Sequence, residues 1–523
     1  MNARLSRYVV SVVLIVTLAL AVAPLAGAQE GSAPDYWPTE GWRTSTPEEQ
    51  GMDSAALATF VQRMGMGAGF HSVLVIRHGT IVLDASVPPY SPDQPHYLAS
   101  TTKVITSTLL GMAIEKGYVQ GVDQSIWDFF SKDATANMDA RKEAITIQHL
   151  LTQTSGFDFG FGEDWLEFSV LTEADQSWVQ FLLDRQMATE PGTTFNYMDG
   201  NPLLVSAIIG QTAGMPADEF ARQNLFDPLG MGEVLWLRDP QGVSQGGDRC
   251  FMSPYDMARL GYLFLRNGEW DGQQIVPAAW VEEATTNYIK PHYWEGYGYY
   301  WYSGSFGIED TAPRGYSALG MGGQEIWVIP DLDLVIVLTG DLIFNGLTHI
   351  TMFLVPAVQS ETTLPDNPEA YAALQAQVEK LSNPAPTAVE PLPEAAGQIS
   401  GKVYTLAEND LGWKTASLAF GEQEATLTLE LADRTLELPI GLDGVVRLST
   451  AGLPPEPILR PVDNVPLASK GKWESTKSFT ITVHDTLGLV DAQLRISAGE
   501  VLYLQLQPNM GFLSAPNIRG TLQ

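Results

Sequence analysis

Apolar positions between residues 72 and 339 follow the strand period at both ends and the helix period in the middle. Residues 72–85, SVLVIRHGTIVLDA, alternate well enough to predict two strands around a His78-Gly79 turn. Residues 324–339, QEIWVIPDLDLVIVLT, predict a second apolar hairpin with Pro-Asp-Leu-Asp at its turn. The stretches between them that predict helices are 100–116, 144–153, 173–185, 201–213, 253–267 and 277–285. Strands at both ends with helices between them predict an α+β fold, in which sequence-distant strands close an antiparallel sheet and helices form an insertion.

The pattern changes after about residue 360. Residues 367–382 predict a short helix, and residues 383–396, NPAPTAVEPLPEAA, are typical of a semi-rigid Pro-rich spacer. The strand-like runs that follow are GKVYTL, ATLTLEL, RTLELPI, FTITV, AQLRI and VLYLQLQ. We therefore expect an α+β domain over residues 29–360, a helix and linker over 361–397, and an all-β barrel or sandwich over 398–523.

The first 28 residues predict a secretory signal peptide. Arg4 and Arg7 precede an apolar run from Tyr8 to Val22, and Ala26-Gly27-Ala28 form a small-residue cleavage site. No later stretch has the roughly 18 consecutive apolar residues of a membrane span. We expect an exported protein, periplasmic or extracellular, with no stable membrane insertion after cleavage.

Charge and composition exclude several classes of function. The chain has 29 basic and 61 acidic residues and a net charge of −32, which argues against nucleic acid as a partner. The seven histidines are scattered without metal-ligand spacing, so we expect no metal site and no cofactor. A single cysteine, Cys250, excludes an internal disulfide. At 523 residues the chain is long enough for two or three domains without such a link.

The sequence YLASTTKVITSTLLGMAIEKGYV, residues 97–119, predicts a buried helix that starts near Ser100. Serine is a favoured N-cap, but a capping box would place Glu or Gln where Lys103 stands. Burial and the helix dipole both disfavour a charged lysine, so the pattern predicts a lowered pKa for Lys103. Because positions i and i+3 share a helix face, Lys103 is placed to act as general base for a Ser100 nucleophile.

A second serine motif gives an alternative nucleophile. Residues 242–246, GVSQG, fit the G-x-S-x-G pattern around Ser244. That motif requires a strand before the serine and a helix directly after it, whereas RDPQ precedes it here and GD follows. The flanking loops favour Ser100.

Several stretches together resemble the serine β-lactamase and penicillin-binding-protein superfamily. Ser100-Thr-Thr-Lys103 resembles its Ser-x-x-Lys motif. The other matching stretches are ITIQHLLTQTSGFDF (145–159), PGTTFNYMDGNPLLVSAIIGQTAG (191–214) and ALGMGGQEIWVIPDLDLVIV (318–337). Residues 37–57 and 252–280 are similar to the branch of 6-aminohexanoate-dimer hydrolases and esterases. The resemblance implies a β-lactamase/transpeptidase-like domain over about residues 37–345, and the C-terminal part resembles the lipocalin-like extension of some relatives.

The resemblance also implies roles for individual residues. Tyr197 matches the family's active-site tyrosine and would relay the serine proton with Lys103, although a core aromatic is the alternative for an isolated tyrosine. The oxyanion hole would use the backbone N–H groups of Ser100 and Met321. The substrate-binding candidates are Asp199, Gly320, Gly322 and Gly323. The aromatic residues of the segment 293–302 are equally consistent with a wall of the acyl pocket and with a half-buried strand.

Two departures from the family pattern bear on the substrate. Asp199 stands where the larger family has Asn, which would raise the pKa of Lys103 and move the base role toward Tyr197, or would select a cationic amine. Ala318 replaces the basic residue of the third motif, so the usual partner of a β-lactam carboxylate is missing.

The sequence thus predicts a serine hydrolase that cleaves an ester or amide of a small-molecule or short peptide-like substrate through a Ser100 acyl-enzyme. The alternatives are a DD-peptidase or β-lactamase and, in another class, a catalytically inactive cell-envelope binding protein. The sequence pattern does not indicate an oligomeric state.

Overall fold

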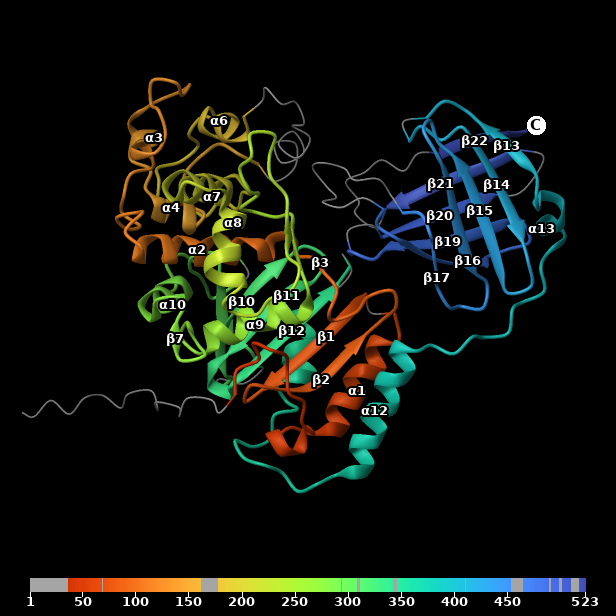
Figure 1. The fold of residues 1–523 in the computed structure, drawn as a ribbon, viewed down its shortest axis with the longest axis horizontal. Helices are drawn as coiled ribbons and strands as arrows, with labels where there is room; N and C mark the ends of the chain where they lie inside the picture. Colours follow the sequence, from red (N-terminus) through yellow and green to blue (C-terminus); the bar gives the residue numbers. More distant parts are fainter. Residues whose placement is uncertain are drawn as a thin grey trace, which may run out of the picture. The chain divides into compact units, whose positions relative to one another are not determined.

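A seven-stranded antiparallel sheet forms the centre of the N-terminal domain in the computed structural model (Figure 1). The structure describes residues 36–523 except 68, 161–176, 293, 308–310, 342–345, 410, 453–463, 489–490, 498–500 and 509–516. The strands, in their order across the sheet, are β2 (Thr80–Ser86), β1 (Phe70–Arg77), β12 (Leu334–Gly340), β11 (Gln324–Ile329), β10 (Arg314–Gly320), β9 (Tyr302–Ser305) and β8 (Gly296–Tyr297).

Pairing between β1 and β12 closes the sheet with strands from opposite ends of the domain. Val75 faces Ile336 in this antiparallel register, as the sequence pattern predicts. Both strands are buried on both faces, which explains their nearly continuous apolar runs. The predicted turn is present, with His78 at φ 49° and Gly79 at φ 75°, a left-handed conformation that glycine adopts at little cost.

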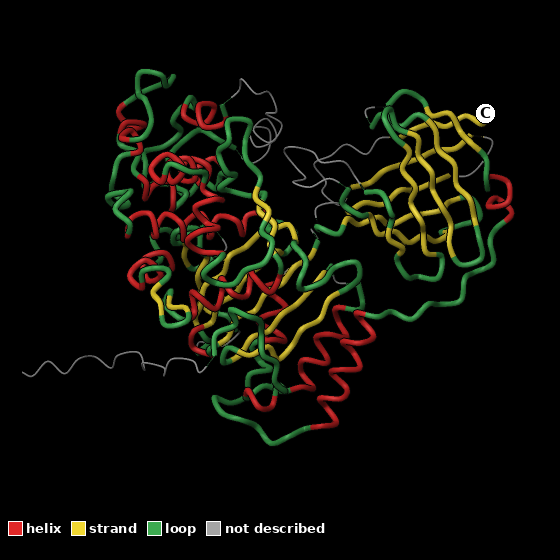
Figure 2. The backbone as a smooth tube through the Cα atoms, in the orientation of Figure 1, coloured by secondary structure: helices red, strands yellow, loops and turns green. Residues whose placement is uncertain are grey.

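Helices cover both faces of this sheet. Helices α1 (Ser54–Met64) and α12 (Pro368–Ser382) lie side by side over one face (Figures 1 and 2). Helix α9 (Pro254–Leu265) packs on the other face against β1, β11 and β12. The remaining helices of this part are α2 (Thr102–Glu115), α3 (Ala140–Glu143), α4 (Ile147–Leu151), α6 (Trp178–Leu183), α7 (Gly200–Ala213), α8 (Ala217–Ala221), α10 (Ala278–Thr285) and α11 (Gly346–His349).

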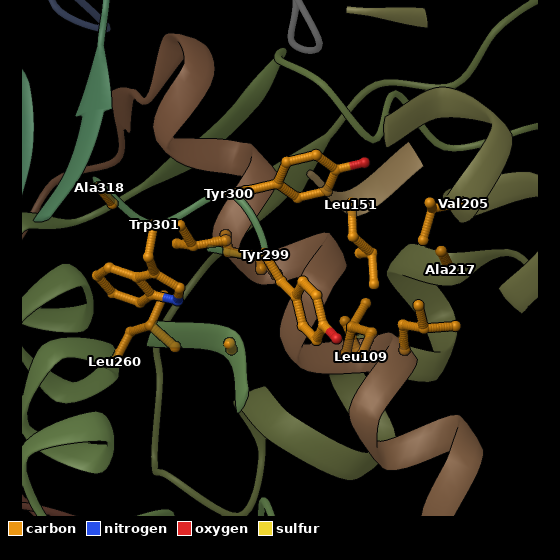
Figure 3. Packing of buried hydrophobic residues seen from close by; sticks show 14 of the residues in the cluster. Leu109, Leu151, Val205, Ala217, Leu260, Tyr299, Tyr300, Trp301 and Ala318 are labelled. Atoms are coloured by element: carbon orange, nitrogen blue, oxygen red, sulfur yellow. The ribbon is translucent and has the colours of Figure 1, made fainter. Parts of the chain in front are cut away.

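The helical insertion shares one hydrophobic core with the sheet. Figure 3 shows side chains of α2, α4, α7 and α9 converging with the aromatic segment 299–301. Ala318 of β10 also belongs to this core and is fully buried. The Ala318 side chain therefore packs against apolar neighbours. Two small sheets lie apart from the central one. The first contains β3 (His96–Tyr97), β5 (Cys250–Met252) and β4 (Leu235–Trp236), and the second contains β6 (Glu269–Trp270) and β7 (Gln273–Gln274).

The C-terminal strands form a closed barrel, which resolves the choice between barrel and sandwich. The pairing of Gly441 in β16 with Lys470 in β18 joins the ends of a nine-stranded path, and β17 adds to β18. Strand β15 shows the alternation expected of a barrel, with Leu427 and Leu429 inside. The elements after the linker are α13 (Glu394–Ile399), β13 (Val403–Leu406), β14 (Thr415–Phe420), β15 (Glu424–Glu430), β16 (Thr435–Gly441), β17 (Arg447–Leu448), β18 (Leu467–Trp473), β19 (Ser478–Asp485), β20 (Asp491–Ser497), β21 (Val501–Pro508) and β22 (Asn517–Leu522).

The expected signal peptide, residues 1–28, lies outside the described residues, as does the start of the expected helix 173–185. Within the described part of the chain, no helix is both long and apolar enough to span a membrane.

Packing of α2 against α10 gives a prediction for stability. A Cβ atom on Gly111 of α2 would lie 2.3 Å from the Trp280 ring, whereas one on Gly210 of α7 would meet its nearest atom at 3.5 Å. We expect Gly111→Ala to lower the free energy of unfolding by about 1–3 kcal/mol through overpacking. Gly210→Ala, the control, should be neutral or stabilising by up to about 1 kcal/mol, because alanine favours helix. Equal unfolding midpoints for the two variants in urea would contradict this packing.

Candidate active site

Ser100 lies in a single 3-10 turn, η2 (Ala99–Thr101), directly before α2. The α-helix itself begins at Thr102, two residues later than the sequence predicts, and Ser100 is not its N-cap. Ala99 has φ 46°, a left-handed conformation that is strained for a residue with a side chain. The Thr101 hydroxyl anchors the turn by donating to the Gln324 carbonyl at 2.6 Å. The turn therefore holds Ser100 in a partly exposed position against β11.

The amino group of Lys103 reaches the Ser100 hydroxyl, as the i, i+3 spacing predicts. Lys103 Nζ lies 2.8 Å from Ser100 Oγ, 2.5 Å from Asp199 Oδ1 and 2.8 Å from the Gly247 carbonyl oxygen. An ammonium has three N–H donors, and these three acceptors satisfy all of them. The Lys103 side chain is only 2% exposed and that of Asp199 only 9%, so the ion pair is buried.

The predicted lowering of the Lys103 pKa is wrong. Burial does lower the pKa of Lys103, but the charge of Asp199 and the hydrogen bond to it outweigh burial and hold this pKa above the ordinary lysine value. The other expectation, that Asp199 in place of the family's Asn raises the pKa of Lys103, agrees with this direction. Lys103 is consequently an ammonium at neutral pH.

Tyr197 lies beside both groups. The Lys103 Nζ is 4.8 Å from the centre of the Tyr197 ring, and the Tyr197 hydroxyl is close enough to Lys103 and Ser100 for both to lower its pKa. Burial raises the pKa of Tyr197, and the neighbouring ammonium offsets this rise only in part. The phenol therefore keeps its proton in the resting site.

Gln153 positions the loop that carries Tyr197 and Asp199. Its fully buried amide donates from Nε2 to the Met198 carbonyl at 3.0 Å and accepts at Oε1 from the Asn201 amide at 2.7 Å. Gln153 itself has φ 58°. Sequence reasoning missed this residue, although it stands inside the matching stretch 145–159.

A cavity of about 260 Å³ opens beside the nucleophile. Gly320 and Met321 line it at the end of β10, and a Cβ on Gly320 would lie 2.4 Å from the Leu98 carbonyl. The glycine thus permits β10 to approach the nucleophile turn. The lining residues are Tyr97, Ala99, Ser100, Tyr197, Asp199, Asp248, Leu319, Gly320 and Met321. Gly322 and Gly323, both at φ 86°, form the following turn and are not part of the lining.

The loop at residues 246–248 completes the site and was not anticipated. Gly247 supplies a carbonyl to Lys103, and Asp248 lines the cavity. A Cβ on Gly247 would lie 2.9 Å from the Asp199 carbonyl oxygen, so this close approach favours glycine. The Gly246-Gly247-Asp248 sequence was the available signal, but it overlaps the end of the rejected serine motif.

The other candidates lie outside the cavity. Ser244 is fully buried and its hydroxyl donates to Asp218 at 2.6 Å, a structural contact. Tyr297, Tyr299, Tyr300 and Trp301 are at most 2% exposed and belong to the core instead of the pocket wall. No group of three or more His, Cys, Asp or Glu side chains able to hold a metal occurs in the described part of the chain.

Residues 54–341 match the family model described as Beta-lactamase, which is more than half of the chain. The chain therefore belongs to the β-lactamase family and is an enzyme of that family. The match includes Ser100, Lys103, Tyr197 and both lining carboxylates.

The curated relatives include acyltransferases and a hydrolase. The chain is 26% identical over 221 residues to the monacolin J acid methylbutanoyltransferase of Aspergillus terreus, covering 39% of this chain and 53% of that protein. It is 25% identical to the 6-aminohexanoate-dimer hydrolase of Paenarthrobacter ureafaciens, over 50% of this chain and 70% of that protein. The chain thus spans about half the length of several curated relatives. A putative 6-aminohexanoate-dimer hydrolase structure from Bacillus anthracis aligns with TM-score 0.47 at 18% identity, covering 66% and 88%.

The Lys103–Asp199 pair predicts a pH effect. Asp199→Asn removes the charge that raises the Lys103 pKa, and burial then lowers that pKa further. Because a base must lose its proton before it accepts one from serine, we expect the rising limb of kcat/KM against pH to move down by at least about one unit. The assay is hydrolysis of a p-nitrophenyl ester. Asp271→Asn, at an exposed turn, should keep the wild-type profile, and a superimposable Asp199→Asn profile would refute the coupling.

Proposed function

We propose that the protein is a serine hydrolase that cleaves esters or amides of small molecules through an acyl-enzyme on Ser100. The observation that carries the proposal is the buried Lys103–Asp199 ion pair, hydrogen-bonded to Ser100 and next to Tyr197, beside a small cavity. A nucleophile, a proton-transfer group and a cavity at the nucleophile are the elements that acyl transfer requires.

The proposed first step starts from the form in which Lys103 has lost one proton to solvent. Ser100 Oγ attacks the carbonyl carbon, and the Lys103–Tyr197 pair, with Lys103 as the amine, takes the serine proton. The pair then returns this proton to the leaving alcohol or amine. The backbone N–H groups of Ser100 and Met321 would stabilise the oxyanion. Water releases the acyl group in the second step, with the same pair accepting its proton. Asp199 acts through Lys103 by holding its amino group toward Ser100.

A fluorophosphonate probe tests this function directly. We expect the intact mass of the wild-type protein to increase by one adduct, and Ser100→Ala to show none, because only an activated serine reacts rapidly. Ser244→Ala is the matched control and should label like wild type. No adduct on wild type, together with no hydrolysis of short p-nitrophenyl esters, would favour a catalytically inactive binding protein. Stable labelling by penicillin or its rapid turnover would instead favour the DD-peptidase or β-lactamase alternative.

Transfer of the acyl group to an alcohol is a second candidate activity, because several relatives are named as acyltransferases or methylbutanoyltransferases. An acyl-enzyme of this kind partitions between water and any acceptor bound in the same cavity. We expect added small alcohols to yield ester product at the expense of acid, at unchanged total turnover when acylation limits the rate. Mass spectrometry of the products measures the ratio of ester to acid. Acid as the sole product at every alcohol concentration would confine the activity to hydrolysis.

Export and the resemblance of the C-terminal barrel to a lipocalin-like extension belong to the same proposal. Support for export comes from the N-terminal pattern of Arg4, Arg7 and the apolar run before Ala28. Fractionation of cells that produce the full chain, with N-terminal sequencing, tests it. An intact N-terminus in the cytoplasm would contradict export.

A further inference from the structure

Charge in the catalytic cavity is distributed unevenly. Two carboxylates, Asp199 and Asp248, line the cavity, while no Lys or Arg is among its lining residues. Lys103 lies behind the wall, where Ser100, Asp199 and Gly247 take up its three donors. Ala318, at the position of the family's basic residue, is buried in the core. A substrate carboxylate would therefore meet negative charge and no available cation in this cavity.

The two carboxylates differ in how they are compensated. Asp199 forms a 2.5 Å ion pair with Lys103. Asp248 forms a longer ion pair, with its Oδ2 3.6 Å from Arg249 Nε, and the Arg249 guanidinium also lies 5.3 Å from the Trp178 ring. The Asp248 side chain is only 14% exposed. Burial raises the pKa of Asp248, and Arg249 and Lys103 oppose this rise incompletely. Asp248 is thus the carboxylate whose charge is less well compensated.

Aromatic rings accompany Asp248 in the same cavity. Tyr97 and Tyr197 both line it, and Asp248 is close enough to Tyr97 to raise the pKa of that phenol, together with burial. Aromatic rings next to a carboxylate are the chemistry that recognises ammonium groups, through cation–π attraction and direct charge pairing. A neutral acyl group would leave the Asp248 charge buried without a new partner.

We propose that Asp248, with the rings of Tyr97 and Tyr197, binds a positively charged nitrogen of the substrate next to the scissile carbonyl. The substrate class is then esters or amides that carry an ammonium group on the acyl or the leaving side. This inference rests on the proposed function, whose reaction occurs in the same cavity. It assigns specificity to Asp248 and leaves Asp199 as the partner of Lys103.

Isosteric substrate pairs test the inference. Acetylcholine and 3,3-dimethylbutyl acetate differ by a charge on the leaving side, and the ethyl esters of β-alanine and butanoic acid differ by a charge on the acyl side. We expect wild type to show a higher kcat/KM for the cation in at least one pair. Asp248→Asn should reduce that cation-to-neutral ratio by at least about tenfold, because truncating one partner of a buried charge pair is costly. Hydrolysis of the neutral ester should continue.

Two variants control the experiment. Asp271→Asn removes one exposed charge and should keep the wild-type ratio, which excludes an effect of net charge. Asp248→Glu keeps the carboxylate and should retain part of the preference. If Asp248→Asn fails to fold, an experiment on wild type replaces it, in which a ligand competes with the fluorophosphonate for the cavity. Choline should then slow fluorophosphonate labelling of Ser100 at lower concentration than 3,3-dimethylbutan-1-ol, and equal potency would overturn the inference.

The possible failures are distinguishable. Unchanged ratios for both pairs in Asp248→Asn, with neutral esters still hydrolysed, would overturn the role of Asp248 and leave the proposed function standing. A ratio that falls in Asp199→Asn but not in Asp248→Asn would move the cation to Asp199 and also overturn it. If wild type shows no hydrolysis and no labelling, that result would overturn the proposed function together with this inference.

Discussion

The buried ammonium of Lys103 is the interaction on which the site depends. A lysine that is 2% exposed is costly unless every N–H finds an acceptor, and here the acceptors come from three separate segments. The nucleophile turn provides Ser100, the loop before α7 provides Asp199, and the loop before β5 provides Gly247. Satisfying one ammonium therefore brings these segments together beside the cavity. The same geometry gives the serine a partner for its proton.

This arrangement explains how a cationic lysine is compatible with proton transfer. Two N–H groups directed at Asp199 and Gly247 remain in place whether Lys103 carries three protons or two. In the ammonium form the third proton points at Ser100, and in the amine form the lone pair does. Loss of one proton thus converts a donor to the serine into an acceptor without rearrangement. Asp199 holds the Lys103 amino group in place, but it also stabilises the ammonium and therefore raises the pKa of Lys103.

Much of the fold was predictable because it depends on local pattern. The strands around His78-Gly79 and Pro330–Asp333 occur where alternation and turn residues placed them, and the β1–β12 pairing follows from strands at both ends of the domain. The Ser100–Lys103 contact was predictable because three residues separate them on one helix face. The closed barrel needed the Gly441–Lys470 pairing, which no local pattern specifies.

The parts that sequence reasoning missed depend on contacts between distant segments. Asp199 is 96 residues from Lys103, and Gly247 is 144 residues from it. Burial and the helix dipole, which local pattern supplies, predicted the wrong direction for the Lys103 pKa, and only the family resemblance pointed to an effect of Asp199. Gln153 and Asp248 were missed for the same reason, since their roles arise from loops that meet only in the folded chain. The aromatic segment 299–301 gave no signal that separated a core from a pocket wall.

The protonation state of Lys103 tests the account most directly. NMR of the full chain with 13C at lysine Cε, assigned with Lys103→Met, measures this state during a pH titration. The account predicts that the Lys103 resonance stays in the ammonium range through the pH at which the exposed lysines titrate. A Lys103 resonance that titrates at or below the ordinary lysine pKa would contradict the account.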